Sequence, residues 1–270
     1  MNAYQNPSPR RKPELLAPGG SYEKARIAFL YGADAVYVAG KGFNLRALSK
    51  NLDDEELAAL AFIARSSGKR LYITLNAFLR PHEIDQLRLI LQYLDHVGVD
   101  GVILADPALI LLARLHAPSI PLHLSTQAST TNHLAAQFWQ SQGVRRLNLA
   151  RELSFQDIAA IRSQTAIELE VFIHGSLCVS YSGRCLLSDA MARRSANRGY
   201  CAQPCRWSYG LVEQKRPEQF FPLQEDPRGS YILNSKDLCL LDHLEDLVNL
   251  GINSFKIEGR MKGAHYVASV

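Results

Sequence analysis

The sequence lacks long hydrophobic runs. Of its 270 residues, 47% are hydrophobic and 21% are charged, which is typical of a chain that buries a full core. No apolar run approaches the roughly 20 residues of a membrane helix. Residues 1–13 are polar, basic and proline-bearing, without the apolar core of a secretory signal. We therefore expect a cytoplasmic protein that does not contact a membrane, with residues 1–13 as a disordered polar tail.

Motifs for hydrolysis are also missing. The chain contains no G-x-S-x-G elbow and no H-E-x-x-H zinc motif, and no internal repeat or low-complexity tract interrupts it. Ser176 or Cys178 beside His174 is the one pairing that suggests a nucleophile and a base. The net charge of +4 hints at an anionic partner but is too small to indicate nucleic acid by itself.

Cysteine is scarce but concentrated. Four of the five cysteines, Cys178, Cys185, Cys201 and Cys205, fall within 28 residues, and Cys239 follows. In a reducing compartment such a group binds metal more often than it forms disulfides, and an odd count fits a disulfide framework poorly. The spacings C-x6-C and C-x3-C differ from the paired C-x2-C of zinc ribbons. An iron-sulfur cluster tolerates irregular spacing better, while structural zinc and uncoordinated thiols remain alternatives.

Short β-rich runs alternate with stretches of helical periodicity. The expected strands are 14–17, 35–39, 71–76, 101–105, 122–125, 146–150, 168–174 and 254–258. Expected helices include 21–31, 53–66, 83–97 and 238–250. Eight such units in about 260 residues predict an α/β fold, a TIM-like (β/α)8 barrel over 14–270, with a doubly wound open sheet as the structural alternative.

Strand parity predicts a polar site inside this barrel. Alternate residues of a barrel strand face the interior, and active sites lie at the carboxyl ends of the strands. Polar residues occupy the presumed inner positions near these ends on five strands. They are Asn76, Gln127, Asn148, His174, Lys256 and Glu258. Pairing within the interior, for example Glu170 with Lys256, is the alternative explanation.

The segment after the seventh strand is unusually long. Residues 175–233 form a cysteine-rich insertion, and loops of this length are usually functional. In the barrel every cysteine of this insertion would lie on the catalytic face. Cys239 would join them from the first turn of the helix that follows. Gly175, Gly183 and Gly199 would allow the positive φ angles that wrapping a cluster needs.

Several long motifs then resemble the U32 family, originally described as peptidases. The main one runs from Glu170 to Ser188 and reads EVFIHGSLCVSYSGRCLLS. Further matches are ELLAPGG at 14–20, GADAVYVAG at 32–40, NSKDL at 234–238 and KIEGR at 256–260. The segments 197–209 and 229–239 resemble most the branch of prephenate-dependent tRNA uridine hydroxylases.

This resemblance implies an oxygen-independent hydroxylase with a [4Fe-4S] cluster. It implies that the ligands are Cys178, Cys185, Cys201 and Cys239, with Cys205 as a substitute. The substrate would be a uridine at the wobble position of a tRNA anticodon loop, converted to 5-hydroxyuridine with prephenate as the oxygen source. Related members act on ribosomal RNA or ubiquinone precursors, and a peptidase remains the alternative.

The remaining candidates are residues that could contact substrates. Glu258 and Arg260 could orient a small dicarboxylate, unless they pair with each other. Basic and aromatic residues of the insertion could contact RNA. Those carried forward are Arg184, Arg198, Arg206 and Trp207. Because the chain stops a few residues into the eighth helix, we expect this truncated edge to be covered by a partner or by a missing C-terminal region.

Overall fold

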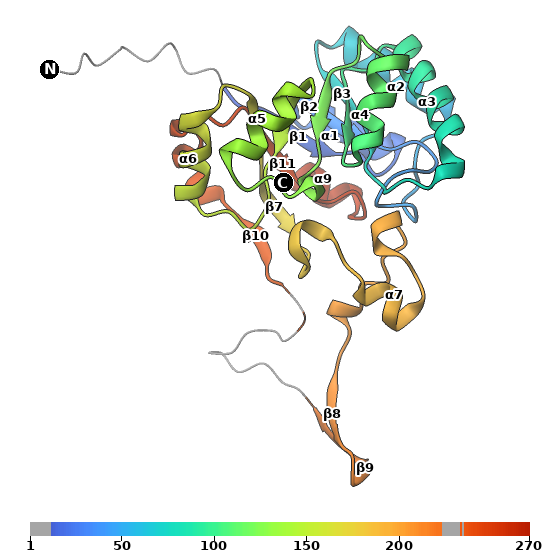
Figure 1. The fold of residues 1–270 in the computed structure, drawn as a ribbon, viewed down its shortest axis with the longest axis vertical. Coiled ribbons are helices and arrows are strands. Elements are labelled where there is room, and N and C mark those ends of the chain that lie inside the picture. The colour runs from blue at the N-terminus through green and yellow to red at the C-terminus, as the bar shows by residue number, and fades with distance from the viewer. Residues whose placement is uncertain (1–11, 223–232, 234) are drawn as a thin grey trace, which may run out of the picture.

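The fold is a closed parallel barrel with helices outside it, as seen in a computed structural model that describes residues 12–222, 233 and 235–270 (Figure 1). The barrel strands are β1 (Glu14–Pro18), β2 (Ala35–Val38), β3 (Arg70–Leu75), β4 (Gly101–Leu104), β5 (Leu122–Leu124), β6 (Val144–Asn148), β7 (Glu168–Ser176) and β11 (Ser254–Ile257). Neighbours pair in parallel around the ring, and the β6–β7 and β1–β11 pairings close it. The predicted (β/α)8 barrel is confirmed, and the open-sheet alternative is wrong.

Helices follow the strands in the expected order. They are α1 (Tyr22–Leu30), α2 (Asp54–Ser66), α3 (Ile84–Val97), α4 (Pro107–His116), α5 (His133–Ser141), α6 (Phe155–Gln164), α7 (Leu187–Ala192), α8 (Leu244–Asn249) and α9 (Ala264–Ser269). Asp53 caps α2 in a reciprocal capping box with Glu56, as the sequence predicts. No helix in the described ranges is both long enough and apolar enough to span a bilayer.

One predicted helix begins late. The expected helix 238–250 starts as the strand β10 (Asp237–Cys239), which pairs antiparallel with the end of β7. A single 3-10 turn, Leu241–His243, then leads into α8. The placement of Cys239 in the first turn of a helix is therefore wrong. The protruding end of β7 leaves backbone groups unpaired, and β10 satisfies them.

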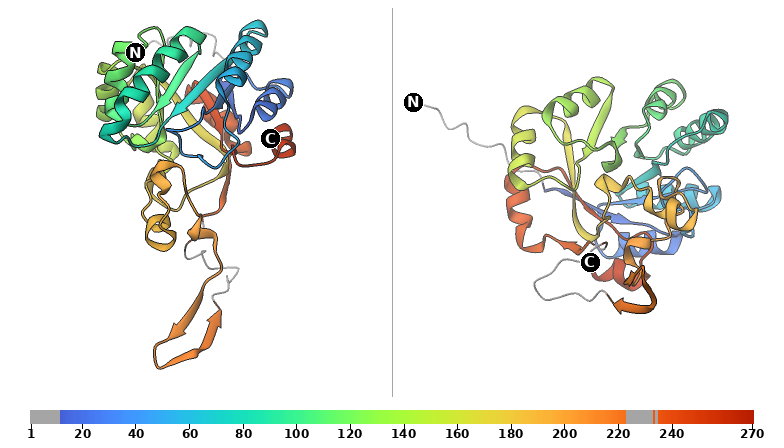
Figure 2. Two further views of the ribbon diagram at one scale, coloured as in Figure 1. Left: turned by 90° about the vertical axis from the view of Figure 1, so that its right-hand side faces the viewer. Right: turned by 60° about the horizontal axis from the view of Figure 1, so that its bottom comes forward.

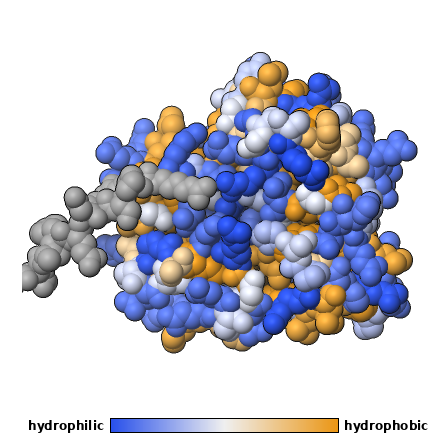
Figure 3. All heavy atoms as spheres, turned by 90° about the horizontal axis from the view of Figure 1, so that it is seen from above, coloured by the Kyte–Doolittle hydropathy of each residue, from blue (hydrophilic) through white to orange (hydrophobic). Residues whose placement is uncertain are grey.

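The insertion after β7 leaves the barrel and returns. It contains α7, several 3-10 turns and the antiparallel pair β8 (Gly210–Glu213) and β9 (Arg216–Pro222). This pair extends away from the barrel (Figures 1 and 2). Most of the predicted tail 1–13 and part of the insertion lie outside the described residues. The opposite end of the barrel is mostly hydrophilic, with scattered apolar residues (Figure 3).

The barrel has an apolar layer outside and a charged interior. The outward strand side chains and the helices form one large core. Inside, a small apolar cluster of Leu16, Ala35, Tyr37, Tyr72 and Ile103 lies beside a buried ionic network.

Glu14 is the centre of this buried network. Its carboxylate contacts Arg146 at 2.5 Å and Arg70 at 2.5 Å, and Tyr72 donates a hydrogen bond to it at 2.8 Å. Glu170 then joins Lys256 at 2.8 Å, which confirms the pairing suggested as an alternative. These ion pairs stabilise the barrel only as long as each buried charge keeps its partner.

We expect Glu14→Ala to lower the free energy of unfolding by about 3–5 kcal/mol, because it leaves the buried Arg146 undercompensated. Urea denaturation measures the loss. Arg145→Ala is the matched control, since this arginine is exposed and its contact with Glu168 should contribute less than about 1 kcal/mol. Equal losses in both variants would contradict the role assigned to the buried network.

Candidate functional site

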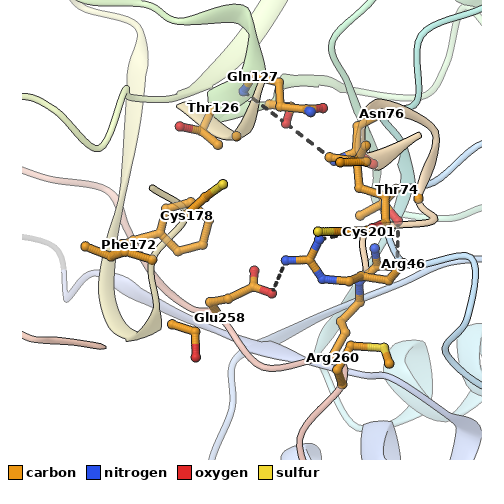
Figure 4. Close-up of a pocket in the computed structure, with 18 of the residues that line it drawn as sticks. Arg46, Thr74, Asn76, Thr126, Gln127, Phe172, Cys178, Cys201, Glu258 and Arg260 are labelled. Atoms are coloured by element: carbon orange, nitrogen blue, oxygen red, sulfur yellow. Dashed lines mark hydrogen bonds and ion pairs between the residues drawn. The ribbon is translucent and has the colours of Figure 1, made fainter. Parts of the chain in front are cut away.

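A cavity of about 380 Å³ opens at the carboxyl ends of the barrel strands. Its wall combines three kinds of side chain: thiols from the insertion, amides and hydroxyls from the barrel strands, and basic residues. Figure 4 shows Cys178, Cys201 and Phe172 around the same space as Glu258 and the arginines. Barrel enzymes place their active sites at this end.

Four thiols line the cavity: Cys178, Cys185, Cys201 and Cys205. Burial raises the pKa of the Cys205 thiol, Cys178 raises it further, and Arg206 lowers it, so these groups interact electrostatically. No three His, Cys, Asp or Glu side chains among residues 12–222, 233 and 235–270 are placed to hold a single metal ion. The donors suit a soft metal or an iron-sulfur cluster.

Cys239 occupies a different position from the other thiols. It is exposed and does not line the cavity. In β10 it lies directly opposite His174 of β7, and opposed residues of an antiparallel pair point to the same face. The structure thus brings together three of the four predicted ligands, with Cys205 as the fourth thiol of the cavity.

Side-chain hydrogen bonds fix the cysteine-bearing turns. Glu152 accepts from the backbone N–H of Ser182 at 2.5 Å and from its hydroxyl at 2.8 Å. Asn197 bonds both backbone groups of Cys185, at 3.1 and 3.0 Å. Gly175, Gly183 and Gly199 have φ angles of +112°, +81° and +91°, as the cluster-wrapping argument predicted. Glu152 therefore anchors the insertion to the barrel, and Asn197, itself part of the insertion, joins two of its turns.

The barrel contributes a set of amides to the cavity. Asn76, Gln127 and Asn148 are at most 9% exposed and line it, as strand parity predicted. Among the described side chains, Asn76 Oδ1, both amide atoms of Gln127, Asn148 Oδ1 and the hydroxyl of Ser176 have no hydrogen-bond partner. Buried polar atoms are normally satisfied, so water or a polar ligand in the cavity is needed to satisfy these atoms.

His174 lies outside the cavity. It was expected inside the barrel with the amides, but it does not line the cavity, and its Nδ1 lies 3.0 Å from the hydroxyl of Tyr266 in α9. The pairing of β7 with β11 shifts by one residue between Lys256 and Ile257, so that His174 pairs with the outward residue Ile257. This bulge reverses the expected parity. It also separates His174 from Ser176 and Cys178 on the cavity wall.

The predicted basic and aromatic contacts divide into two groups. Arg206, Lys256 and Arg260 line the cavity, whereas Arg184, Arg198 and Trp207 do not. Arg198 forms an ion pair with Glu83 and donates to the carbonyl of Phe78 at 2.7 Å. Arg184 donates to the carbonyl of Gln127 at 2.7 Å. Trp207 is 45% exposed on the surface. Arg184 and Arg198 therefore hold the insertion onto the barrel.

Arg46 is a site residue that sequence reasoning missed. Its guanidinium contacts Glu258 at 2.8 Å, so Glu258 pairs with Arg46 and not with Arg260, contrary to the alternative considered above (Figure 4). Burial alone would raise the pKa of Glu258, but Arg46 and Arg260 hold it below its ordinary value. Only its position shortly after β2, at a strand's carboxyl end, could have identified Arg46 from the sequence.

Comparison with known proteins fits this geometry. The family model described as Peptidase family U32 matches residues 20–270. The chain belongs to the U32 family. The solved structure of the U32 peptidase Mk0906 superposes with a TM-score of 0.58 at 16% identity, covering 96% of this chain and 99% of that one, and so shares the fold.

Two curated proteins are similar over nearly the whole chain. The "tRNA hydroxylation protein P1" of Bacillus subtilis (strain 168) is 43% identical over 96% of this chain. The "23S rRNA 5-hydroxycytidine C2501 synthase" of Escherichia coli (strain K12) is 37% identical over 95% of it. The chain spans 61% of the first relative's length and 38% of the second's.

We expect Arg46→Met to reverse the contribution of Glu258 to the pH dependence of the free energy of unfolding. With its lowered pKa, Glu258 stabilises the fold fully above about pH 4.3, and this contribution is lost as the pH falls through the folded-state pKa. Without Arg46, burial raises that pKa, so the contribution is lost as the pH rises. Urea unfolding between pH 4 and 8 should show that the wild type is more stable than Arg46→Met by a free energy that grows with pH. A free-energy difference that stays constant over this range would contradict the role given to Arg46.

Proposed function

We propose that this chain is the catalytic barrel of a tRNA hydroxylase that holds a [4Fe-4S] cluster and forms 5-hydroxyuridine at the wobble position. The observation that carries the proposal is the gathering of four thiols with unsatisfied amides and basic residues in one cavity. The name of the 43% identical relative supports tRNA as the substrate. We place the activity in the cytoplasm, where thiols stay reduced.

The donor set of the cavity fits the cluster. Cys178 and Cys185 belong to every candidate ligand set. The resemblance adds Cys201 and Cys239, and Cys205, which lines the cavity, is the substitute for either of these two. When bound, the cluster would supply one-electron redox chemistry. The anchors on Ser182 and Cys185 would keep the thiol-bearing turns in place around it.

The amides suit a nucleobase. A pyrimidine carries hydrogen-bond donors and acceptors along one edge, and Asn76, Gln127 and Asn148 offer both kinds of group. A wobble base lies in an unpaired loop, so it can enter the cavity without opening a duplex. Six basic residues and one acidic residue line the cavity, and this excess attracts the anionic RNA and an acidic co-substrate such as prephenate.

The geometry does not favour peptide hydrolysis. The single pairing that the sequence suggested needs His174 beside Ser176 or Cys178, and His174 lies against Tyr266 outside the cavity.

The rRNA-modifying relative makes ribosomal RNA the second candidate substrate.

We expect Cys178→Ala to remove the iron and the visible absorption of the protein purified without oxygen, while its circular dichroism stays unchanged. Cys205→Ala and Cys239→Ala form a matched pair, because one should lose the iron and the other keep it, which identifies the fourth ligand. Iron analysis and EPR spectroscopy measure both. A protein that carries zinc and no iron, or that keeps its iron in all three variants, would refute the cluster.

We expect tRNA from cells lacking this protein to lose 5-hydroxyuridine and its derivatives, as measured by mass spectrometry of nucleosides. Cells that express Cys178→Ala should show the same loss, while wild-type protein restores the modification. Unchanged tRNA together with loss of a hydroxylated ribosomal nucleoside would transfer the assignment to ribosomal RNA. Loss of neither modification would refute RNA hydroxylation.

A further inference from the structure

Arg260 is a buried guanidinium without a carboxylate partner. It is 3% exposed, and it directly follows Gly259 at the carboxyl end of β11. Its two side-chain hydrogen bonds within the described structure go to neutral oxygens, Thr74 Oγ1 at 3.1 Å and Asn44 Oδ1 at 3.3 Å. No Asp or Glu oxygen in the described ranges lies within 4.0 Å of it. A buried charge in this state is costly unless something else compensates it.

The backbone is built to hold Arg260 in this position. A Cβ atom on Gly20 would collide with the carbonyl of Arg260, so only glycine permits this close approach. Asn44 is 1% exposed, and its side-chain amide bonds the carbonyls of Gly40 and Gly42. Its Oδ1 accepts from the backbone N–H of Arg46 at 2.8 Å and from Arg260. One amide therefore positions both arginines.

The charges around Arg260 do not balance. Lys256 is matched by Glu170, and Arg46 by Glu258, at 2.8 Å each. Arg260 has no such carboxylate partner, and in Figure 4 it extends beside Arg46 toward Thr74. Burial and the charge of Arg46 lower the pKa of Arg260 to about 10, so it is still charged at neutral pH.

We propose that Arg260, supported by Arg46, binds a carboxylate of a small organic acid in the cavity. This deepens the proposed function, because the acid would be the oxygen donor of the hydroxylation. A carboxylate supplies the counter-charge that Arg260 lacks, and it matches the planar fork of a guanidinium. The sequence suggested Glu258 and Arg260 together for this role, but Glu258 already neutralises Arg46.

The depth of Arg260 favours a small acid over the RNA backbone. A phosphate that joins two nucleotides cannot follow a flipped base to a side chain that is only 3% exposed. A small acid can reach it through the cavity that Arg260 lines. Cations nearer solvent, such as the exposed Arg206 at the cavity, remain available to the RNA.

The test is direct binding of prephenate to the purified full chain with its metal content intact, by calorimetry and by thermal shift. We expect saturable binding that raises the melting temperature of the wild type. Arg260→Gln should weaken the affinity by about tenfold or more, the effect of losing one charge-assisted contact. Arg260→Lys keeps the charge but loses the fork, so it should give an intermediate loss.

Arg145→Gln is the control, since this exposed arginine lies at the other end of the barrel and should bind prephenate as the wild type does. Undiminished binding by both Arg260 variants, or no binding by the wild type, would overturn the carboxylate site. Inorganic phosphate that binds as tightly and competes would overturn its assignment to a carboxylate. Prephenate binding that is intact in a protein without iron or RNA hydroxylation would instead overturn the proposed function alone.

Discussion

The charges inside the barrel must be matched, and this constraint organises the molecule from one end to the other. At the amino-terminal end of the strands, Glu14 pairs with Arg146 and Arg70, and Glu168 supplies a second carboxylate to Arg146. Further along, Glu170 compensates Lys256. At the mouth Glu258 compensates Arg46. Glu170 and Lys256 lie on the neighbouring strands β7 and β11, Glu14 reaches Arg146 of β6 across the interior, and Glu258 and Arg46 lie beyond the ends of β11 and β2. The closed ring brings these segments together. Arg260, also at the mouth, has no carboxylate partner within the described structure.

Much of this interior follows from sequence parity, because alternation along a barrel strand is a local rule. It correctly placed Asn76, Gln127, Asn148 and Glu258 in one cavity. It failed at His174, because a bulge depends on how two strands pair and not on either strand alone. A different rule, helical periodicity, failed at Cys239, because the segment that carries this residue pairs with the end of β7 as a strand. Helical periodicity carries no information about such a backbone partner.

The insertion was predictable in its position but not in its attachment. Its length and cysteines mark it as functional, yet its anchors come from distant segments. Glu152 holds Ser182, Glu83 holds Arg198, and the carbonyl of Gln127 holds Arg184. The same basic side chains would have been read as RNA contacts from composition alone. Once their partners are known, the charge available for RNA is reduced to the cations that line or border the cavity.

The loop that follows β2 contacts both the arginines and the cysteine-bearing insertion of the cavity. Asn44 in this loop positions Arg46 and Arg260. The same loop contacts the insertion, because Ala47 donates to the carbonyl of Gly199 at 3.2 Å. A Cβ atom on Gly199 would collide with the carbonyl of Asn44, so the contact is close enough to require glycine. Gly199 lies two residues before Cys201, so the thiols and the arginines of the cavity are connected through closely packed backbone.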